Sequence, residues 1–237
     1  MINCSRAYER GPKAAADMTF TIIAQDPQTQ ALGVATATGS IAVGAQVPHC
    51  RFGVGAIATQ GFSTNVLFAR RGLPLLARGD SAPDVVRALT AEDEGRDFRQ
   101  LAVMDAAGDT AGWTGAANSD YKDHRAEKGL IVAGNILAGP QVLDAMLAAF
   151  HGGGETGDLA ARLLAALAAG EAAGGDSRGT CSAALLVDGG NGAALNLRVD
   201  YDADPVAALQ ALHERSKDQV YRDFLQRLPN EQDPDRY

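Results

Sequence analysis

Runs of apolar and β-branched residues, separated by turn-forming residues, recur along the chain and predict β-strands. The run "TFTIIAQD" at 19–26 is followed by the turn-like "PQTQ" and by "ALGVATAT" at 31–38, so these two runs predict a hairpin. Further strands are expected at 52–60, 100–106, 109–115, 129–137, 181–189 and 193–201. Because strands come as hairpins more often than they alternate with helices, we expect mainly antiparallel sheets.

Segments with apolar residues at helical spacing predict the helices of the protein. They lie at 65–80, 81–93, 139–150, 157–170 and 204–228, the last as one long terminal helix. Gly72 and Pro74 interrupt the first segment, and Ser81 is the expected N-cap of the second.

The order of elements is strands, two helices, strands, two helices, strands and a helix. Each helix pair has to cover a sheet face to bury its apolar stripe. The pattern therefore predicts an α+β fold, a four-layer αββα sandwich of two stacked antiparallel sheets, and a three-layer α/β sandwich is the alternative. We expect a single domain over 18–228, an extension over 1–17 upstream of the true start, and a tail over 229–237.

Composition narrows the classes of function. Hydrophobic residues make up 46% of the 237 residues, and the formal net charge is −8, which disfavours a surface that tracks nucleic-acid phosphates. The three cysteines and four histidines show no metal-ligand spacing, so we expect no metal and no cofactor. No apolar run approaches the length of about 20 residues that spans a membrane. Reduced thiols and the lack of a secretory signal favour a cytoplasmic protein.

The strand that opens the patterned sequence begins with Thr19, directly after Met18. If translation starts at Met18 and the methionine is removed, Thr19 becomes the terminal residue. A terminal threonine carries its own base, the α-amine, and this is one way to activate a hydroxyl nucleophile. The alternative is that Thr19 is simply a β-forming residue at a strand start.

Several ordered segments resemble a bacterial family known as domain of unknown function 1028, which is similar to the N-terminal-nucleophile (Ntn) hydrolases. They are "MTFTIIAQDP", "LGVATAT", "AVGAQVPHCRFGVGAIATQ", "RRGLPLLARG", "WTG", "DHRAEKGLIVAGNIL", "AAGGDSRGTCSAALLV" and "LRVDYDADP". The resemblance implies the αββα sandwich and an amidohydrolase in which the Thr19 hydroxyl attacks an amide carbonyl. Its α-amine would move the proton, and backbone N–H groups would hold the oxyanion.

The chain departs from proteasome-type members of that superfamily. Those members place an aspartate after the second strand and a lysine on the following one. Here the corresponding regions read "ATATGS" and "GAQVPHC", with neither residue. The proteasome mechanism is therefore not carried over.

The segment "GGDSRGTCS" at 174–182 is the strongest polar cluster. Its Asp176, Arg178 and Ser182 are candidate substrate-binding residues, and Arg178 can clamp a carboxylate. The alternative is a loop salt bridge. Thr180 follows a glycine, like the cleavage site of asparaginase-type relatives, and is the alternative nucleophile.

Other candidates stand at strand ends or in loops. Asn135 ends an apolar strand and is expected to donate to an oxyanion or orient the substrate, with a structural hydrogen bond as the alternative. His124 lies in the charged segment "DYKDHRAEKG", which we expect to be a loop, and either reaches the site or is solvated. Thr59 and Gln60 close the strand "AIATQ" and are expected to line the pocket.

Two classes of function follow. The first is an amidohydrolase that acts on a C–N bond of a small molecule, with Thr19 and Asn135 as catalytic residues. The second is a non-catalytic ligand-binding or assembly protein that keeps the sandwich. The alanine-rich helices leave apolar faces, so we expect a homo-oligomer, most simply a dimer.

Overall fold

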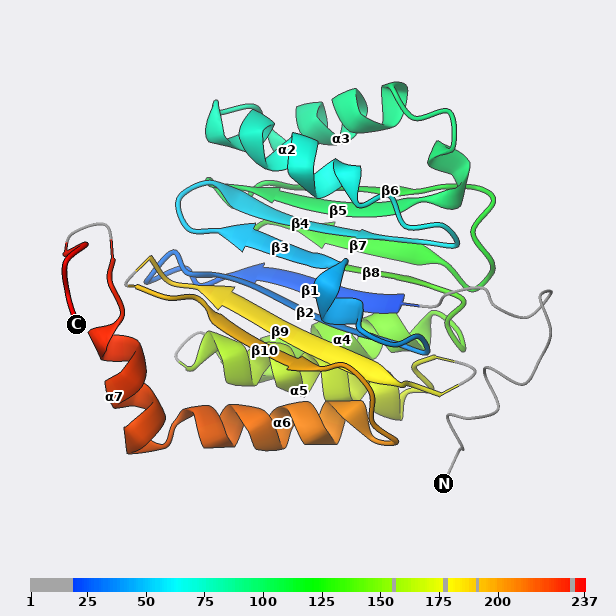
Figure 1. Ribbon diagram of the computed structural model, residues 1–237. Coiled ribbons are helices and arrows are strands. Elements are labelled where there is room, and N and C mark those ends of the chain that lie inside the picture. The colour runs from blue at the N-terminus through cyan, green and yellow to red at the C-terminus, as the bar shows by residue number, and fades with distance from the viewer. Residues whose placement is uncertain (1–18, 155–156, 177–178, 191, 231–232) are drawn as a thin grey trace.

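Two antiparallel β-sheets stacked face to face form the centre of the protein in a computed structural model, which describes residues 19–154, 157–176, 179–190, 192–230 and 233–237 (Figure 1). The six-stranded sheet has the order β10-β9-β2-β1-β8-β7, and the four-stranded sheet has the order β3-β4-β5-β6. The strands are β1 (Thr19–Gln25), β2 (Leu32–Thr38), β3 (Pro48–Arg51), β4 (Gly55–Gln60), β5 (Gln100–Asp105), β6 (Thr110–Thr114), β7 (Asp123–Glu127), β8 (Leu130–Asn135), β9 (Ser182–Asp188) and β10 (Leu195–Val199).

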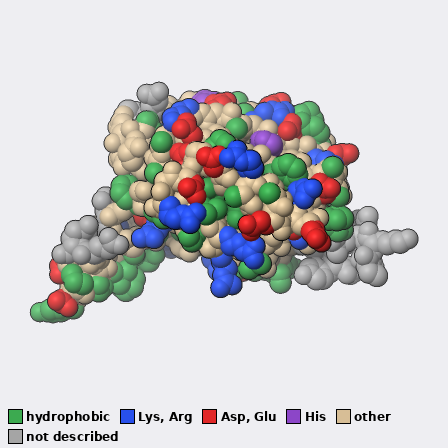
Figure 2. Space-filling view, turned by 90° about the horizontal axis from the view of Figure 1, so that it is seen from above, with side chains coloured by type: hydrophobic (Ala, Val, Ile, Leu, Met, Phe, Trp, Pro, Cys, Tyr) green, Lys and Arg blue, Asp and Glu red, His purple; other side chains and the backbone are tan. Residues whose placement is uncertain are grey.

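Helices cover the outer face of each sheet (Figure 1). They are α2 (Leu67–Ala77), α3 (Ala82–Ala91), α4 (Gln141–Gly152), α5 (Leu159–Ala172), α6 (Pro205–Ser216) and α7 (Gln219–Arg227), with short 3₁₀ turns η1 (Val43–Ala45) and η2 (Arg96–Phe98). Helices α2 and α3 lie on the four-stranded sheet, while α4, α5 and α6 lie on the six-stranded sheet. Seen from the α2–α3 side, basic and acidic side chains are interspersed (Figure 2).

The helices and the two sheets form four layers, and an apolar core lies at each of the three interfaces between them. Ile57 and Leu101 pack against α2 and α3, Ile23 and Ile131 pack between the sheets, and Phe20 packs against α4 and α5. Each core excludes water from one interface, which is the dominant favourable contribution to folding. The expected four-layer αββα sandwich is confirmed.

Local sequence explains where the helices begin and how closely they pack. The Ser81 hydroxyl accepts a hydrogen bond from the Asp84 N–H and caps α3, as predicted. Gly72 lies inside α2, where a Cβ would stand 2.5 Å from Ile57 Cδ1. The glycine therefore allows α2 to approach β4 closely, although glycine costs helix propensity.

Three elements differ from the sequence-based expectation. The terminal segment 204–228 forms two helices because Asp218 takes extended backbone angles between them. Strands β3 and β7 were not expected, and β7 replaces the predicted charged loop. Both are short edge strands of their sheets, where charged side chains remain in water and the apolar pattern is lost.

The state of the cysteines and the length of the helices can also be compared with the sequence-based expectations. Cys181 is disulfide-bonded, so the expectation that every thiol is reduced is wrong for this residue, whereas Cys50 is free. Three cysteines exclude a disulfide framework but allow one bond. Within the described ranges, none of the helices has both the length and the apolar character needed to cross a membrane.

Candidate functional site

The space between the two sheets is apolar at one end and polar at the other. On β1, Ile23 faces the opposite sheet in the apolar part, and the inward positions toward the strand start are threonines. On β8, Ile131 and Ala133 are apolar and Asn135 ends the row. The polar end of this space, which we call the polar layer, consists of Thr19, Thr21, Thr36, Thr38, Gln60, Gln100 and Asn135.

Thr19 begins the central strand β1 within the polar layer. Its backbone stands opposite Thr38 on β2 and Asn135 on β8, and only 4% of its surface is exposed. Its hydroxyl donates to Thr38 Oγ1 at 3.3 Å, and its carbonyl accepts from Gln60 Nε2 at 3.2 Å. The predicted position of Thr19 at a strand start inside a sandwich is therefore correct.

Gln100 organises the amide groups of the polar layer. Its Nε2 donates to the backbone carbonyls of Gly134 at 2.8 Å and Asp123 at 3.0 Å. Because a carbonyl cannot donate, these contacts fix which end of the Gln100 amide is nitrogen. Its Oε1 then accepts from Gln60 Nε2 at 2.7 Å and from Asn135 Nδ2 at 3.0 Å.

This orientation determines what Asn135 offers. One N–H of its Nδ2 donates to Gln100 Oε1, while its buried Oδ1 has no hydrogen-bond partner among the described residues. A buried unpaired acceptor is unusual and needs a partner or a reason. In this arrangement Asn135 Oδ1 can accept a hydrogen bond, and Nδ2 has a second N–H beside the one that it donates to Gln100.

A hydroxyl chain extends the network from Gln60 into β1 and β2. The Thr21 hydroxyl donates to Gln60 Oε1 at 2.6 Å, and Thr36 Oγ1 lies 2.7 Å from Thr21 Oγ1. Since the single hydroxyl proton of Thr21 goes to Gln60, Thr36 is the donor in the second contact. Threonine and amide side chains from both sheets thus form one connected network.

His124 joins the same network through Thr114. His124 Nδ1 lies 2.9 Å from Thr114 Oγ1, which lies 3.0 Å from Gln100 Nε2. Thr114 Oγ1 shares the two N–H groups of that nitrogen with the Gly134 and Asp123 carbonyls. Burial lowers the pKa of His124, Asp123 opposes that shift and Arg125 adds to it. The imidazole is therefore neutral at pH 7, and it lies on strand β7 within reach of the polar layer.

The other predicted residues lie nearby with different roles. The Ser182 hydroxyl donates to the Ser40 carbonyl at 2.7 Å and accepts from Val43 N, so it holds the segment after β2. Thr59 points to the opposite face of β4, where its hydroxyl donates to the Asn65 carbonyl at 2.9 Å. Arg178 lies outside the described residues.

Asp176 is buried at the same end of the six-stranded sheet, where its backbone bridges to Leu137. It lines a cavity of about 260 Å³ together with Glu171, Thr180 and Asp204. Burial raises the pKa of Glu171, the hydrogen bond from the Thr180 hydroxyl opposes that shift, and the charge of Asp204 adds to it. Thr180 thus contacts a carboxyl group, and nothing in this arrangement marks it as a nucleophile.

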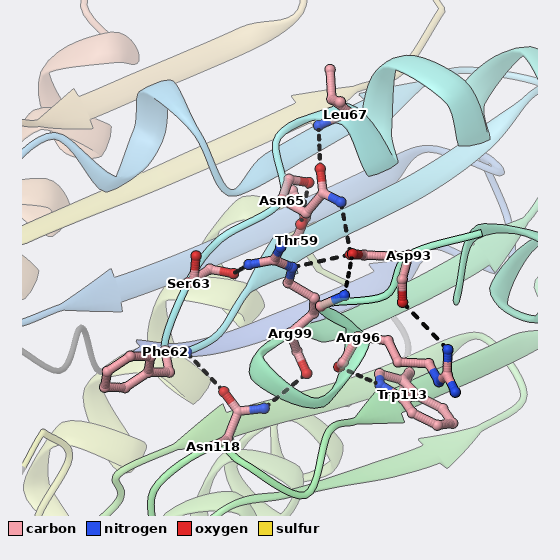
Figure 3. Close-up of polar contacts among 11 residues, drawn as sticks. Thr59, Phe62, Ser63, Asn65, Leu67, Asp93, Arg96, Arg99, Trp113 and Asn118 are labelled. Atoms are coloured by element: carbon pink, nitrogen blue, oxygen red, sulfur yellow. Dashed lines mark hydrogen bonds and ion pairs between the residues drawn. The ribbon is translucent and has the colours of Figure 1, made fainter. Parts of the chain in front are cut away.

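The sequence analysis did not identify Gln100, nor the contacts of Arg99 with Asp93 and Ser63. Gln100 is a polar residue at the start of the apolar strand β5, the same signal that singled out Asn135 at the end of β8. Arg99 Nε pairs with Asp93 Oδ2 at 3.0 Å, and Arg99 Nη1 donates to the Ser63 carbonyl (Figure 3). No local pattern signals that pairing.

The side chains that could ligate a metal ion are dispersed over the described part of the chain. Within it, no three or more His, Cys, Asp or Glu side chains are grouped to hold a metal ion. The polar layer itself offers neutral amides and hydroxyls.

The fold and the polar layer define an α+β protein in which two stacked antiparallel sheets share a buried network of amide and hydroxyl groups. The chain belongs to the family of unknown function DUF1028, whose model matches residues 19–209. It is similar to the crystal structure of protein SPO2555 from Silicibacter pomeroyi, also of that family. That similarity has 37% identity and a TM-score of 0.86, and covers 92% of this chain and 98% of that one. None of the curated proteins matches.

Proposed function

We propose that the protein is an amidohydrolase of the Ntn type, which cleaves a C–N bond of a small molecule with Thr19 as nucleophile. The observation that carries the proposal is the pairing of Thr19 with Asn135. Thr19 begins the central strand, and the neighbouring strand β8 presents a buried oxygen, Asn135 Oδ1, that has no donor among the residues that the structure describes. The family match also begins at Thr19.

The chemistry requires a form of the chain that begins at Thr19. The Thr19 hydroxyl attacks the amide carbonyl while its α-amine accepts the hydroxyl proton. The tetrahedral intermediate collapses, the amine leaves with that proton, and an ester to Thr19 remains. Water then hydrolyses the ester, which releases the acid and regenerates the hydroxyl.

The surroundings of Thr19 suit an amine base. The described side chains of the polar layer are uncharged, so burial favours the neutral amine over the ammonium. Asn135 Oδ1 can accept a hydrogen bond from that amine and orient it. This arrangement supplies a base without the aspartate and lysine of the proteasome-type enzymes.

Matched variants test the proposal. A form beginning at Thr19 and the full-length chain are assayed on simple amides and acyl-amino acids, and intact mass establishes the terminal residue. Thr19→Ser should retain part of the activity and Thr19→Ala should abolish it. Thr110→Ala, at the start of β6, is the control and should be fully active. Parent-level activity in Thr19→Ala would make Thr19 structural.

The second candidate is a non-catalytic binding protein, favoured by the complete burial of Asn135 and Gln60 in a network that also has structural value. It predicts that a small molecule stabilises the fold while no form hydrolyses an amide. In either case we propose a cytoplasmic homodimer. Sedimentation equilibrium that shows only monomer at micromolar concentration would contradict the dimer.

A further inference from the structure

Two phenylalanines, Phe62 and Phe98, lie side by side just beyond the polar layer. Their ring centroids are 5.9 Å apart, and the residues are 44% and 45% exposed. Phe62 follows Gln60 by two residues and Phe98 precedes Gln100 by two, and these glutamines face each other across β4 and β5. The Ser63 N–H donates to the Phe98 carbonyl at 3.2 Å, so the two segments stay paired beyond the strands.

Hydrogen bonds hold both aromatic segments rigidly. Asn118 Oδ1 accepts from the Phe62 N–H at 2.7 Å, and Asn118 Nδ2 donates to the Arg99 carbonyl at 2.8 Å (Figure 3). Gly61 has a φ of 126°, and a Cβ there would stand 2.6 Å from the Phe98 carbonyl oxygen. The exposure of the two rings is therefore built into the fold and does not come from a loose loop.

The two rings form an exposed apolar pair, and the exposed Arg96 and Asp97 precede Phe98 in the turn η2. Val66 and Leu67, at the start of α2, are also exposed, by 45% and 40%. Arg99, which follows Phe98, is only 18% exposed in its side chain and contacts Asp93 and the Ser63 carbonyl. Two exposed aromatic rings that hydrogen bonds hold in place are a candidate binding surface for an apolar group.

The position of Phe62 and Phe98 relative to Thr19 indicates which part of a ligand they contact. Gln60 contacts the Thr19 carbonyl at 3.2 Å, and Phe62 is two residues further along the chain. The aromatic pair therefore follows from the same end of the two sheets at which Thr19 lies. We infer that Phe62 and Phe98 form the subsite for an apolar, preferentially aromatic, group attached next to the amide that is cleaved. This inference rests on the proposed function.

Binding of a matched pair of acids tests the inference without turnover. Phenylacetate and acetate differ by one phenyl group and represent the product acid with and without the apolar part. Binding is measured by NMR titration on the form beginning at Thr19 and on the full-length chain. Phe62→Ala and Phe98→Ala should each weaken phenylacetate binding roughly 2- to 10-fold, the usual range for one aromatic contact, and leave acetate unchanged.

Two further variants sharpen the test. Phe62→Leu keeps an apolar side chain and should retain part of the phenylacetate affinity, because it loses only the ring–ring contact. Phe52→Ala is the matched control, since Phe52 is 39% exposed and lies in the turn at the opposite end of β4. It should bind phenylacetate like the parent.

The outcomes separate this inference from the hydrolase proposal. Phenylacetate binding that depends on the rings, without hydrolysis of any amide, supports the subsite and rejects the hydrolase. Amide hydrolysis that Phe62→Ala and Phe98→Ala leave unchanged for both acetyl and phenylacetyl substrates overturns the subsite alone. Failure of the parent to bind phenylacetate also overturns it. The same holds if these variants change only the oligomeric state, because the aromatic pair is then a contact between subunits.

Discussion

Gln60 and Gln100 face each other across β4 and β5, and Gln60 Nε2 donates to Gln100 Oε1 at 2.7 Å. This single contact links the hydroxyl chain of the six-stranded sheet to the asparagine at the end of β8. Amide groups that satisfy one another in a dry interior specify one arrangement of the two sheets, because any shift leaves several of them unpaired.

Replacement of Gln100 by leucine should destabilise the protein by about 3 kcal/mol, because the Asn135 Nδ2 and the Gly134 carbonyl lose a partner in a buried place. Urea unfolding followed by circular dichroism measures the change. Gln141→Leu is the control, since Gln141 is exposed on α4, and it should stay within about 0.5 kcal/mol of the parent. Equal stability of the two variants would show that the network contributes nothing to the free energy of unfolding.

Gly112 on β6 should not tolerate alanine. A Cβ there would lie 2.5 Å from His124 Cδ2, so we expect a loss of roughly 1–3 kcal/mol from overpacking. The cost should fall when His124 is also replaced by alanine, because the clash is then removed. A double-mutant cycle measures this coupling, and simple additivity of the two substitutions would contradict the packing argument.

Stability should decrease as pH falls below about 6.5, the ordinary pKa of histidine. Burial lowers the pKa of His124, and also of His49, where the hydrogen bond with the Gln46 carbonyl opposes the shift. The unfolded chain then binds protons that the folded chain does not, so acidification favours unfolding. Urea unfolding at pH 7.5 and 5.5 measures the effect.

The histidine variants identify the source of that pH dependence. His124→Gln and His49→Gln should each reduce the difference between pH 7.5 and 5.5, and the double variant should reduce it most. An undiminished difference in the double variant would assign the dependence to other groups.

Glu171 should destabilise the protein at neutral pH. Burial is the chief cause that raises the pKa of Glu171, so the folded state favours the protonated carboxyl. The stability that this carboxyl contributes is therefore lost as pH rises above the ordinary pKa of glutamate, and it is absent at pH 7. Glu171→Gln removes the charge and keeps an oxygen that can accept from Thr180, so its melting temperature should rise at pH 7 and match the parent near pH 3.

The exposed Glu214 provides the opposite control. The hydrogen bond from Lys217 and its charge lower the pKa of Glu214. The stability that Glu214 contributes is therefore present above the ordinary pKa of glutamate and lost in acid. Glu214→Gln should therefore give no increase at pH 7. A Glu171→Gln variant that melts below the parent at pH 7 would show that the carboxylate is needed.

Local pattern predicted the layers, the Ser81 cap and the position of Thr19, because each depends on residues close in sequence. The roles of Thr59 and Gln60 could not be assigned in the same way. Both faces of β4 are buried, so its pattern does not alternate and does not tell which residue faces the other sheet. The structure directs Gln60 toward Thr19 and Thr59 toward the helices.

Contacts between residues far apart in sequence could not be predicted from local sequence patterns. Gln100 meets Asn135 across two sheets, and that meeting depends on how the sheets stack. The edge strand β7 and the break at Asp218 were missed because neither carries the apolar pattern or the glycine that marks such features. Asn135 Oδ1 has no partner among the described residues, and this could be found only from the orientation of the Gln100 amide, which three-dimensional contacts define.

The four-stranded sheet comes from one uninterrupted stretch, 48–114, whereas the six-stranded sheet joins segments from both sides of it. During synthesis on the ribosome, β3–β6 with α2 and α3 can assemble while β8 and β9 are still to be translated. Strand β1 must wait for β8, which arrives more than a hundred residues later. The neighbours of Thr19 are therefore completed late, and a nascent chain cut short before Asn135 would carry the threonine without its site.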